Sequence, residues 1–190
     1  MEADWEVEIG GGAHVVEAAW AGFVDLRRMP EAVEQLPEAG ALPGLAEVLI
    51  RLNAHDSPVW TAKCDAWELE VFDPDEMDVA EAGAQAGAAC YVDLLPRETA
   101  SWVEHADAAE WCGRVCERLQ GIALRSCRVD LVVRAAEFAE ERAGIAVTAY
   151  ASAAGADTAR ARRRLVQALA VLADTLMQMA ATDESTKKLQ

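Results

Sequence analysis

The sequence has no uninterrupted apolar run of the roughly 20 residues that span a bilayer, and residues 1–5 contain neither a basic segment nor an apolar core. Its three histidines, His14, His55 and His105, follow none of the paired spacings of zinc sites. Gly10, Gly11 and Gly12 precede neither the Lys nor the Ser or Thr of a phosphate-binding loop. We therefore expect a cytoplasmic protein without a membrane span, and these patterns identify no catalytic residue.

Basic residues are scarce in the first half of the chain. The formal net charge is −16, and residues 1–100 hold 21 acidic and 5 basic side chains, against 12 of each in residues 101–190. Nucleic acids and anionic membranes attract proteins through Lys and Arg, so this charge argues against both as partners. It suits a basic protein partner better, as in an adaptor or a toxin inhibitor.

Cysteine is also sparse, with an odd count of five. A chain of 190 residues that is 53% hydrophobic is long enough to fold around an apolar core without disulfides. We expect reduced, mostly buried thiols in a cytosolic protein. Residues 1–181 are predicted to form one α+β domain, and residues 182–190 form a polar tail.

Strands are predicted where apolar side chains alternate with polar ones. Residues 5–9 alternate, Gly10 to Gly12 favour a turn, and residues 14–27 alternate again, which predicts a β-hairpin. Residues 59–72 form another predicted strand, whose apolar positions change phase near Ala66, so we expect a bulge there. Three further strands are predicted in residues 90–96, 126–134 and 145–151.

Helices are predicted where the apolar spacing changes to three or four residues. A short helix begins at Pro43 and carries Leu45, Val48, Leu49 and Leu52 on one side. A second helix begins with Ser101 and Glu104 at the spacing of a capping box. Asp157 is the expected N-cap of a long terminal helix.

These elements follow the order ββα three times along the chain. A helix after each pair of strands favours a mainly antiparallel sheet of about six strands with the helices on one face, in a ferredoxin-like or related arrangement. The other face of the sheet is then polar. Its predicted binding residues, from neighbouring strands, are Lys63, Asp65, Trp67, Tyr91, Asp93, Arg97, Arg128, Asp130, Arg134 and Tyr150.

Ordinary ion pairs on a solvated sheet are the simpler explanation of the charged residues on this face. Two functions are also consistent with it. The leading hypothesis is a non-catalytic binding or protein-interaction domain without a cofactor, whose partner is a protein or a small polar ligand. A homodimer is also consistent with this hypothesis. The alternative is a metal-dependent phosphohydrolase or nuclease, in which Asp65, Asp93 and Asp130 converge to bind Mg²⁺ or Mn²⁺.

Overall fold

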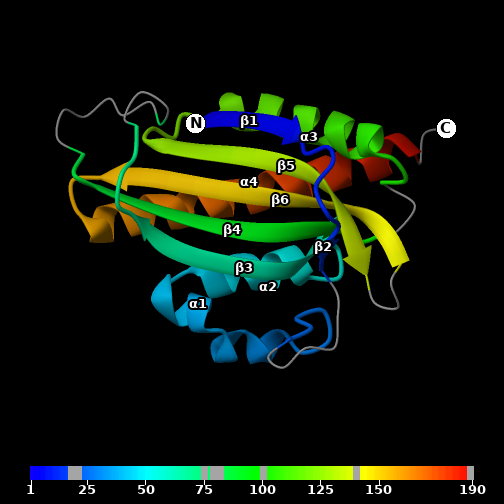
Figure 1. Cartoon of the computed structure of the whole chain (residues 1–190), viewed down its shortest axis with the longest axis horizontal. Coiled ribbons are helices and arrows are strands. Elements are labelled where there is room, and N and C mark those ends of the chain that lie inside the picture. Colours follow the sequence, from blue (N-terminus) through cyan, green and yellow to red (C-terminus); the bar gives the residue numbers. More distant parts are fainter. Residues whose placement is uncertain (17–22, 74–76, 78–83, 99–101, 139–141, 188–190) are drawn as a thin grey trace.

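The computed structural model describes residues 1–16, 23–73, 77, 84–98, 102–138 and 142–187. These residues form an α+β fold with one mixed sheet (Figure 1). In chain order the elements are β1 (Glu2–Val7), β2 (His14–Val15), η1 (Pro30–Gln35), α1 (Pro37–Ala41), α2 (Leu45–Asn53), β3 (Val59–Leu69), β4 (Ala86–Pro96), α3 (His105–Gln120), β5 (Cys127–Phe138), β6 (Arg142–Gly155) and α4 (Thr158–Lys187).

The strand order differs from the predicted ferredoxin-like arrangement. Five strands follow the path β1-β5-β6-β4-β3, and the short β2 pairs with β5 beside β1. The β5–β6, β6–β4 and β4–β3 pairs are antiparallel, whereas β1 and β2 both run parallel to β5. The sheet is therefore mixed, and the prediction of about six mainly antiparallel strands is only partly correct.

The predicted hairpin between residues 5–9 and 14–27 does not form. Val7 pairs with Val133 and His14 with Ala136, so both segments follow the same strand in the same direction. The glycine segment, with Gly10 at φ 85°, accommodates the extra residues between them instead of reversing the chain. Of the predicted return strand, residues 14–15 form β2 and residues 23–27 form no strand, whereas residues 17–22, including Trp20, lie outside the described residues.

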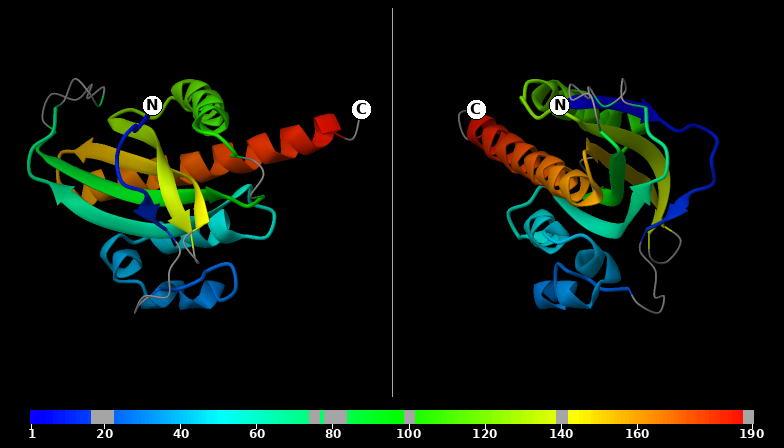
Figure 2. Two further views of the ribbon diagram at one scale, coloured as in Figure 1. Left: turned by 45° about the vertical axis from the view of Figure 1, so that its right-hand side comes forward. Right: turned by 90° about the vertical axis from the view of Figure 1, so that its left-hand side faces the viewer.

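One face of the sheet forms the main core. Helices α3 and α4 lie on this side, whereas β2 lies on the opposite side (Figure 2). Leucines of α4 pack against Leu131 and Val147 of the central strands, all of them nearly inaccessible to solvent. Asp157 caps α4 as predicted, because its Oδ1 accepts a hydrogen bond of 2.7 Å from the Arg160 amide.

Helix α4 is long and apolar enough, in Thr158–Thr182, to cross a membrane by length and composition alone. The core helix of a soluble protein passes the same test. Here Leu165, Leu169, Leu172 and Leu176 are at most 1% exposed and contact the sheet, which accounts for the apolar side of the helix. The helix continues to Lys187, within the segment predicted to be a polar tail.

The bulge in β3 is present but lies earlier than predicted. Its register against β4 shifts between Thr61 and Cys64 instead of near Ala66. Trp60 consequently packs on the face away from the helices, whereas Cys64 and Ala66 pack against the main core. Alternation alone would place Trp60, Cys64 and Ala66 on one face, and the shift in strand pairing separates Trp60 from the other two.

Two helix starts also differ from the prediction. Gly44 is the N-cap of α2 at φ 98°, so Pro43 precedes the helix instead of occupying its first turn. Glu104 is the N-cap of α3 and forms a capping box with Asp107, three residues beyond the predicted start. Ser101, the expected cap, lies outside the described residues. The capping box is therefore present, but Glu104 is its N-cap residue and not its third helical residue.

Candidate binding site on the open sheet face

The face of the sheet opposite α3 and α4, called the open face below, carries aligned polar side chains. Register places Asp65 of β3 beside Tyr91 of β4, and Tyr91 beside Tyr150 of β6. The same row continues through Asp130 of β5 to Asp4 of β1. Directly paired residues point to the same side of a sheet, so five strands contribute to one surface.

One end of the open face is covered by β2. His14 Nε2 lies 3.0 Å from Asp93 Oδ2, although β5 and β6 separate β2 from β4 in the strand order. The sheet must coil strongly for this contact to form, and Figure 1 shows β5 bending across the sheet at this end. Thr148 donates a 2.6 Å hydrogen bond to the other oxygen of Asp93, whose side chain has no exposed surface.

A small apolar cluster lies beneath this cover. It consists of Val16, Trp60, Leu95, Ala136 and Ala146, all at most 6% exposed. The Arg27 guanidinium lies 3.7 Å from the centroid of the Trp60 ring, and both of its bonding nitrogens donate to Asp25 at 2.8 and 2.9 Å. This end of the open face is therefore part of the folded interior.

The other end of the open face is accessible and aromatic. The ring centroids of Trp67 and Tyr91 are 6.3 Å apart, and those of Tyr91 and Tyr150 are 6.0 Å apart. We call these three side chains the aromatic row. Trp67 is 40% exposed, and both tyrosines are partly exposed. Rings at these separations attract each other, so the row is a preformed surface.

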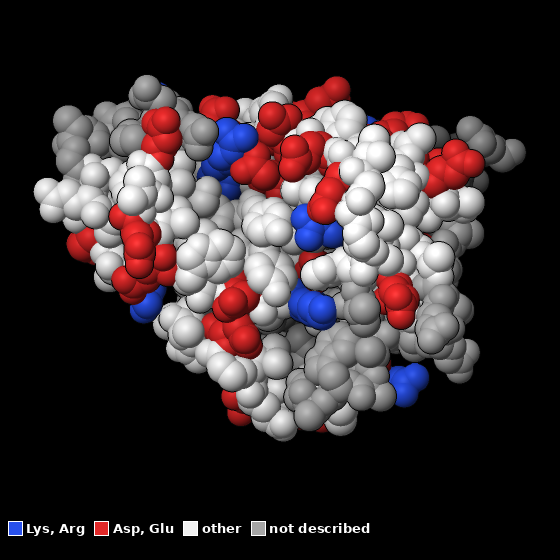
Figure 3. All heavy atoms as spheres, viewed as in Figure 1, with Lys and Arg blue, Asp and Glu red and all other residues white. Residues whose placement is uncertain are grey.

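The charges beside the aromatic row are unevenly paired. Arg128 binds Asp130 at 2.7 Å, and Arg134 binds Glu8 at 3.1 Å. Asp4, Glu6 and Asp65, in contrast, form no ion pair within the described part of the chain. Figure 3 shows acidic side chains around much of this face. A hollow of about 480 Å³ opens here; its lining includes Asp4, Glu6, Arg128, Asp130, Arg134 and Tyr150.

The three aspartates of the metal-dependent alternative do not converge. Asp93 is buried between His14 and Thr148, and Asp130 accepts hydrogen bonds from Arg128. Asp65 accepts a hydrogen bond from the Ala66 amide. Among the described residues, no three His, Cys, Asp or Glu side chains are grouped closely enough to hold a metal ion. This geometry gives the hydrolase alternative no support.

Arg97 has a structural position instead of a place beside the aromatic row. Its guanidinium donates hydrogen bonds of 2.8 to 3.2 Å to four carbonyl oxygens, those of Asn53, Ala54, Ser57 and Val59. These carbonyls lie at the C-terminal end of α2, in the turn that follows and at Val59, the first residue of β3. Arg97 thus joins that turn to the end of β4. Sequence alternation alone had placed Arg97 on the open face.

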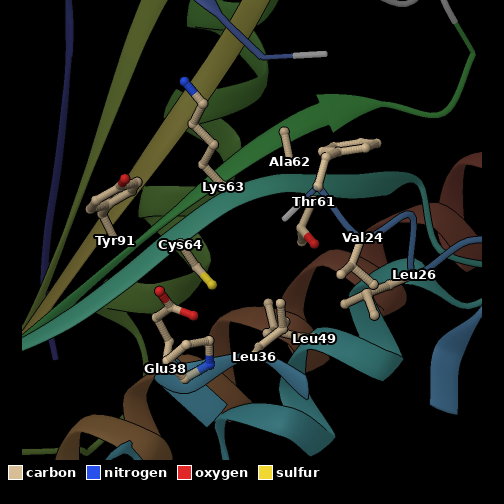
Figure 4. Close-up of a pocket in the computed structure, with 12 residues that line it drawn as sticks. Val24, Leu26, Leu36, Glu38, Leu49, Thr61, Ala62, Lys63, Cys64 and Tyr91 are labelled. Atoms are coloured by element: carbon tan, nitrogen blue, oxygen red, sulfur yellow. The ribbon is translucent and has the colours of Figure 1, made fainter. Parts of the chain in front are cut away.

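Lys63 lies at the bulge of β3, at the margin of a second pocket of about 260 Å³ (Figure 4). Its side chain points away from Leu36 and Leu49, whereas Cys64 points toward them. Burial, together with the nearby carboxylates of Glu38, Asp65 and Asp93, raises the pKa of Cys64 to about 12. A thiol with so high a pKa is a poor nucleophile at neutral pH, so this pocket has no activated cysteine.

The sequence interpretation missed two parts of this face. Glu2, Asp4 and Glu6 alternate along β1 and Glu8 follows directly after it, a visible period-two signal that places a line of carboxylates at one margin. His14 carried no such signal, because its contact with Asp93 depends on the coil of the sheet. The accessible part of the open face is therefore more acidic than the predicted residues alone indicate.

The strand order, the helices on one face and the polar open face define an α+β protein with a mixed sheet and a candidate binding surface. Comparisons of the chain with known protein families, with curated proteins and with solved structures find no match.

Proposed function

We propose that this chain is a non-catalytic protein-interaction domain that binds a basic protein through its open sheet face. The observation that carries the proposal is the uneven pairing of charge beside the aromatic row. Arg128 and Arg134 have internal acidic partners, whereas Asp4, Glu6 and Asp65 form no ion pair in the described part of the chain. Exposed aromatic rings next to carboxylates favour a cationic partner surface.

Binding through the face also agrees with the state of the two sheet edges. In β1 the Trp5 amide donates to Asp4, and the Ala3 carbonyl accepts from Gln120. In β3 the Thr61 amide donates to the Asn53 side chain and the Ala66 amide to Asp65. Side chains that occupy backbone groups of an edge strand oppose the addition of another strand. A partner is therefore expected on the face instead of the edge.

Site-specific photo-crosslinking in cells of the native host tests this proposal. A photoreactive amino acid replaces Glu6, which is exposed on the open face, or Glu117, which is exposed on α3. Both replacements remove one exposed glutamate, so they change the net charge equally. We expect a crosslinked protein of net positive charge from position 6 and none from position 117, with binding of the purified partner weakening as salt rises.

Crosslinks from position 117 alone, or a captured partner of net negative charge, would overturn the proposal. A hydrolase activity of the purified chain that is lost on replacing Asp65 would contradict its non-catalytic part. The homodimer is tested by the same crosslink, because a second copy of this acidic chain would be identified as the captured protein and would count against a basic partner.

A further inference from the structure

The aromatic row supplies ring surfaces from three strands. Trp67 extends from β3, Tyr91 from β4 and Tyr150 from β6. The planes of Trp67 and Tyr91 are inclined by 53°, and those of Tyr91 and Tyr150 by 49°. Inclined rings present both faces and edges to a ligand, and the negative face of an aromatic ring attracts a cation.

Carboxylates adjoin these rings. Asp65 pairs directly with Tyr91 across β3 and β4, and Asp130 pairs directly with Tyr150 across β5 and β6. Burial raises the pKa of Tyr91, and the negative charges of Asp93 and Asp65 raise it further. The carboxylate of Asp65 thus lies close enough to the Tyr91 ring to act on the same positive group.

The open face already contains an arginine bound in this way. Arg27 lies on the Trp60 ring while Asp25 accepts two of its hydrogen bonds. Arg134 is 6.0 Å from the Tyr150 ring and is paired with Glu8. In both cases the guanidinium lies near an aromatic ring, and its nitrogens bind a carboxylate. Planar arginine suits this combination better than lysine does.

We propose that Trp67, Tyr91 and Asp65 form a receptor for an arginine side chain of the partner protein. The guanidinium would stack on the exposed Trp67 ring next to Tyr91, and the Asp65 carboxylate would accept its hydrogen bonds. This inference rests on the proposed function and specifies its central contact. The Asp65 oxygen that accepts from the Ala66 amide leaves the second oxygen for the ligand.

An N-acetylated hexa-arginine amide peptide is the probe, and N-acetylated hexa-citrulline amide, similar in shape but uncharged, is its control. Two-dimensional NMR of the full chain follows the indole N–H signals and gives the dissociation constant. We expect hexa-arginine to shift the Trp67 signal in a saturable way and hexa-citrulline to leave it unchanged. Cation–π contacts at exposed sites predict that Trp67→Ala weakens binding about two- to fivefold.

Matched variants separate this site from general charge and packing effects. Trp5 is also 40% exposed but lies near Gly113 of α3, so Trp5→Ala controls for loss of an exposed indole. Asp65→Asn is expected to weaken binding by a similar factor, whereas Glu117→Gln removes the same charge from an exposed position on α3, on the opposite side of the sheet. Asp65→Asn preserves side-chain size at an exposed position, so it remains informative if Trp67→Ala is unstable.

The inference is overturned if hexa-citrulline binds as tightly as hexa-arginine, or if Trp67→Ala and Asp65→Asn bind like their matched controls. It is also overturned if hexa-arginine shifts the Trp5 signal and not that of Trp67. None of these results removes a basic partner crosslinked from Glu6, so the inference can fail while the proposed function stands. Crosslinking only from Glu117 instead removes the proposed function itself.

Discussion

The two faces of the sheet use the same strands in different ways. Toward α3 and α4, side chains such as Leu131, Val129 and Ala149 have no exposed surface and belong to the main apolar core. On the open face, the alternate residues of these strands form ion pairs, aromatic contacts and the buried Asp93 group. The comparison indicates that the helix face supplies most of the stability and that the accessible end of the open face is available for binding.

The open face is itself divided. At the β2 end, Val16, Trp60 and Asp93 are buried and belong to the folded interior. At the other end, Trp67 and Asp65 are exposed. A substitution at the first end should therefore reduce stability, whereas one at the second end should reduce binding with little change in stability.

The largest loss of stability is expected on the helix face. Leu169 of α4 is 1% exposed within the main core. Leu169→Ala removes buried methyl groups and leaves a cavity, so the free energy of unfolding should fall by about 2–5 kcal/mol. Urea denaturation measures this change, with Trp67→Ala on the open face as the comparison. An equal or larger loss for Trp67→Ala would contradict the assignment of stability to the helix face.

The reactivity of the five thiols measures how far solvent reaches the core on the helix face. Burial raises the pKa of Cys116 to about 12, as it does for Cys64, and that of Cys127 to about 11, against a usual value of 9.0. A rise of three units makes the reactive thiolate about 1000-fold scarcer at neutral pH. We expect native thiols to react with iodoacetamide far more slowly than thiols of the urea-unfolded chain. Rapid native labelling of Cys116 would show that solvent reaches this core.

Much of this division follows from alternation in the sequence. Strands β4, β5 and β6 keep an unbroken period of two in their central segments, so the sequence alone assigns Tyr91, Asp130 and Tyr150 to one face. The three ββα units were also visible, because each helix has a distinct apolar spacing. Alternation therefore predicted the central part of the candidate site and the α+β class.

Features that depend on strand partners could not be read from the sequence. The glycine segment allows a reversal, yet β1 and β2 both pair with β5, a choice made by long-range contacts. The Thr61–Cys64 register shift moves Trp60 to the face opposite Cys64. The burial of Asp93 requires the coil that brings His14 over β4. Arg97 follows Pro96, the last residue of β4, so alternation no longer applies, and its guanidinium binds the carbonyls of Asn53 and Ala54 at the end of α2.

A smaller loss of stability is expected at the covered end of the open face. Asp93→Ala leaves the hydroxyl of Thr148 and the ring nitrogen of His14 without their partner, so the free energy of unfolding should fall by about 1–3 kcal/mol. Asp130→Ala is the matched control, because its pair with Arg128 is partly exposed and should contribute about 0.2–1 kcal/mol. Equal losses in the two variants would show that the covered and accessible ends do not differ in this respect.

The smallest effect is a dependence on pH at the Arg27–Trp60 contact. The hydrogen bond from the Arg27 side chain holds the pKa of Asp25 below its usual value of 3.8, although partial burial opposes this shift. A carboxyl whose pKa is lower in the folded state stabilises the fold above its unfolded pKa, and this contribution disappears as the pH falls through the folded pKa. Asp25→Asn should therefore reduce the free energy of unfolding at pH 5 by a few tenths to about 1 kcal/mol, with the difference from the unsubstituted protein shrinking below pH 3.8. Urea denaturation across this range measures it, and a difference that stays constant with pH would show that the pair contributes through packing on Trp60 instead of through its charge.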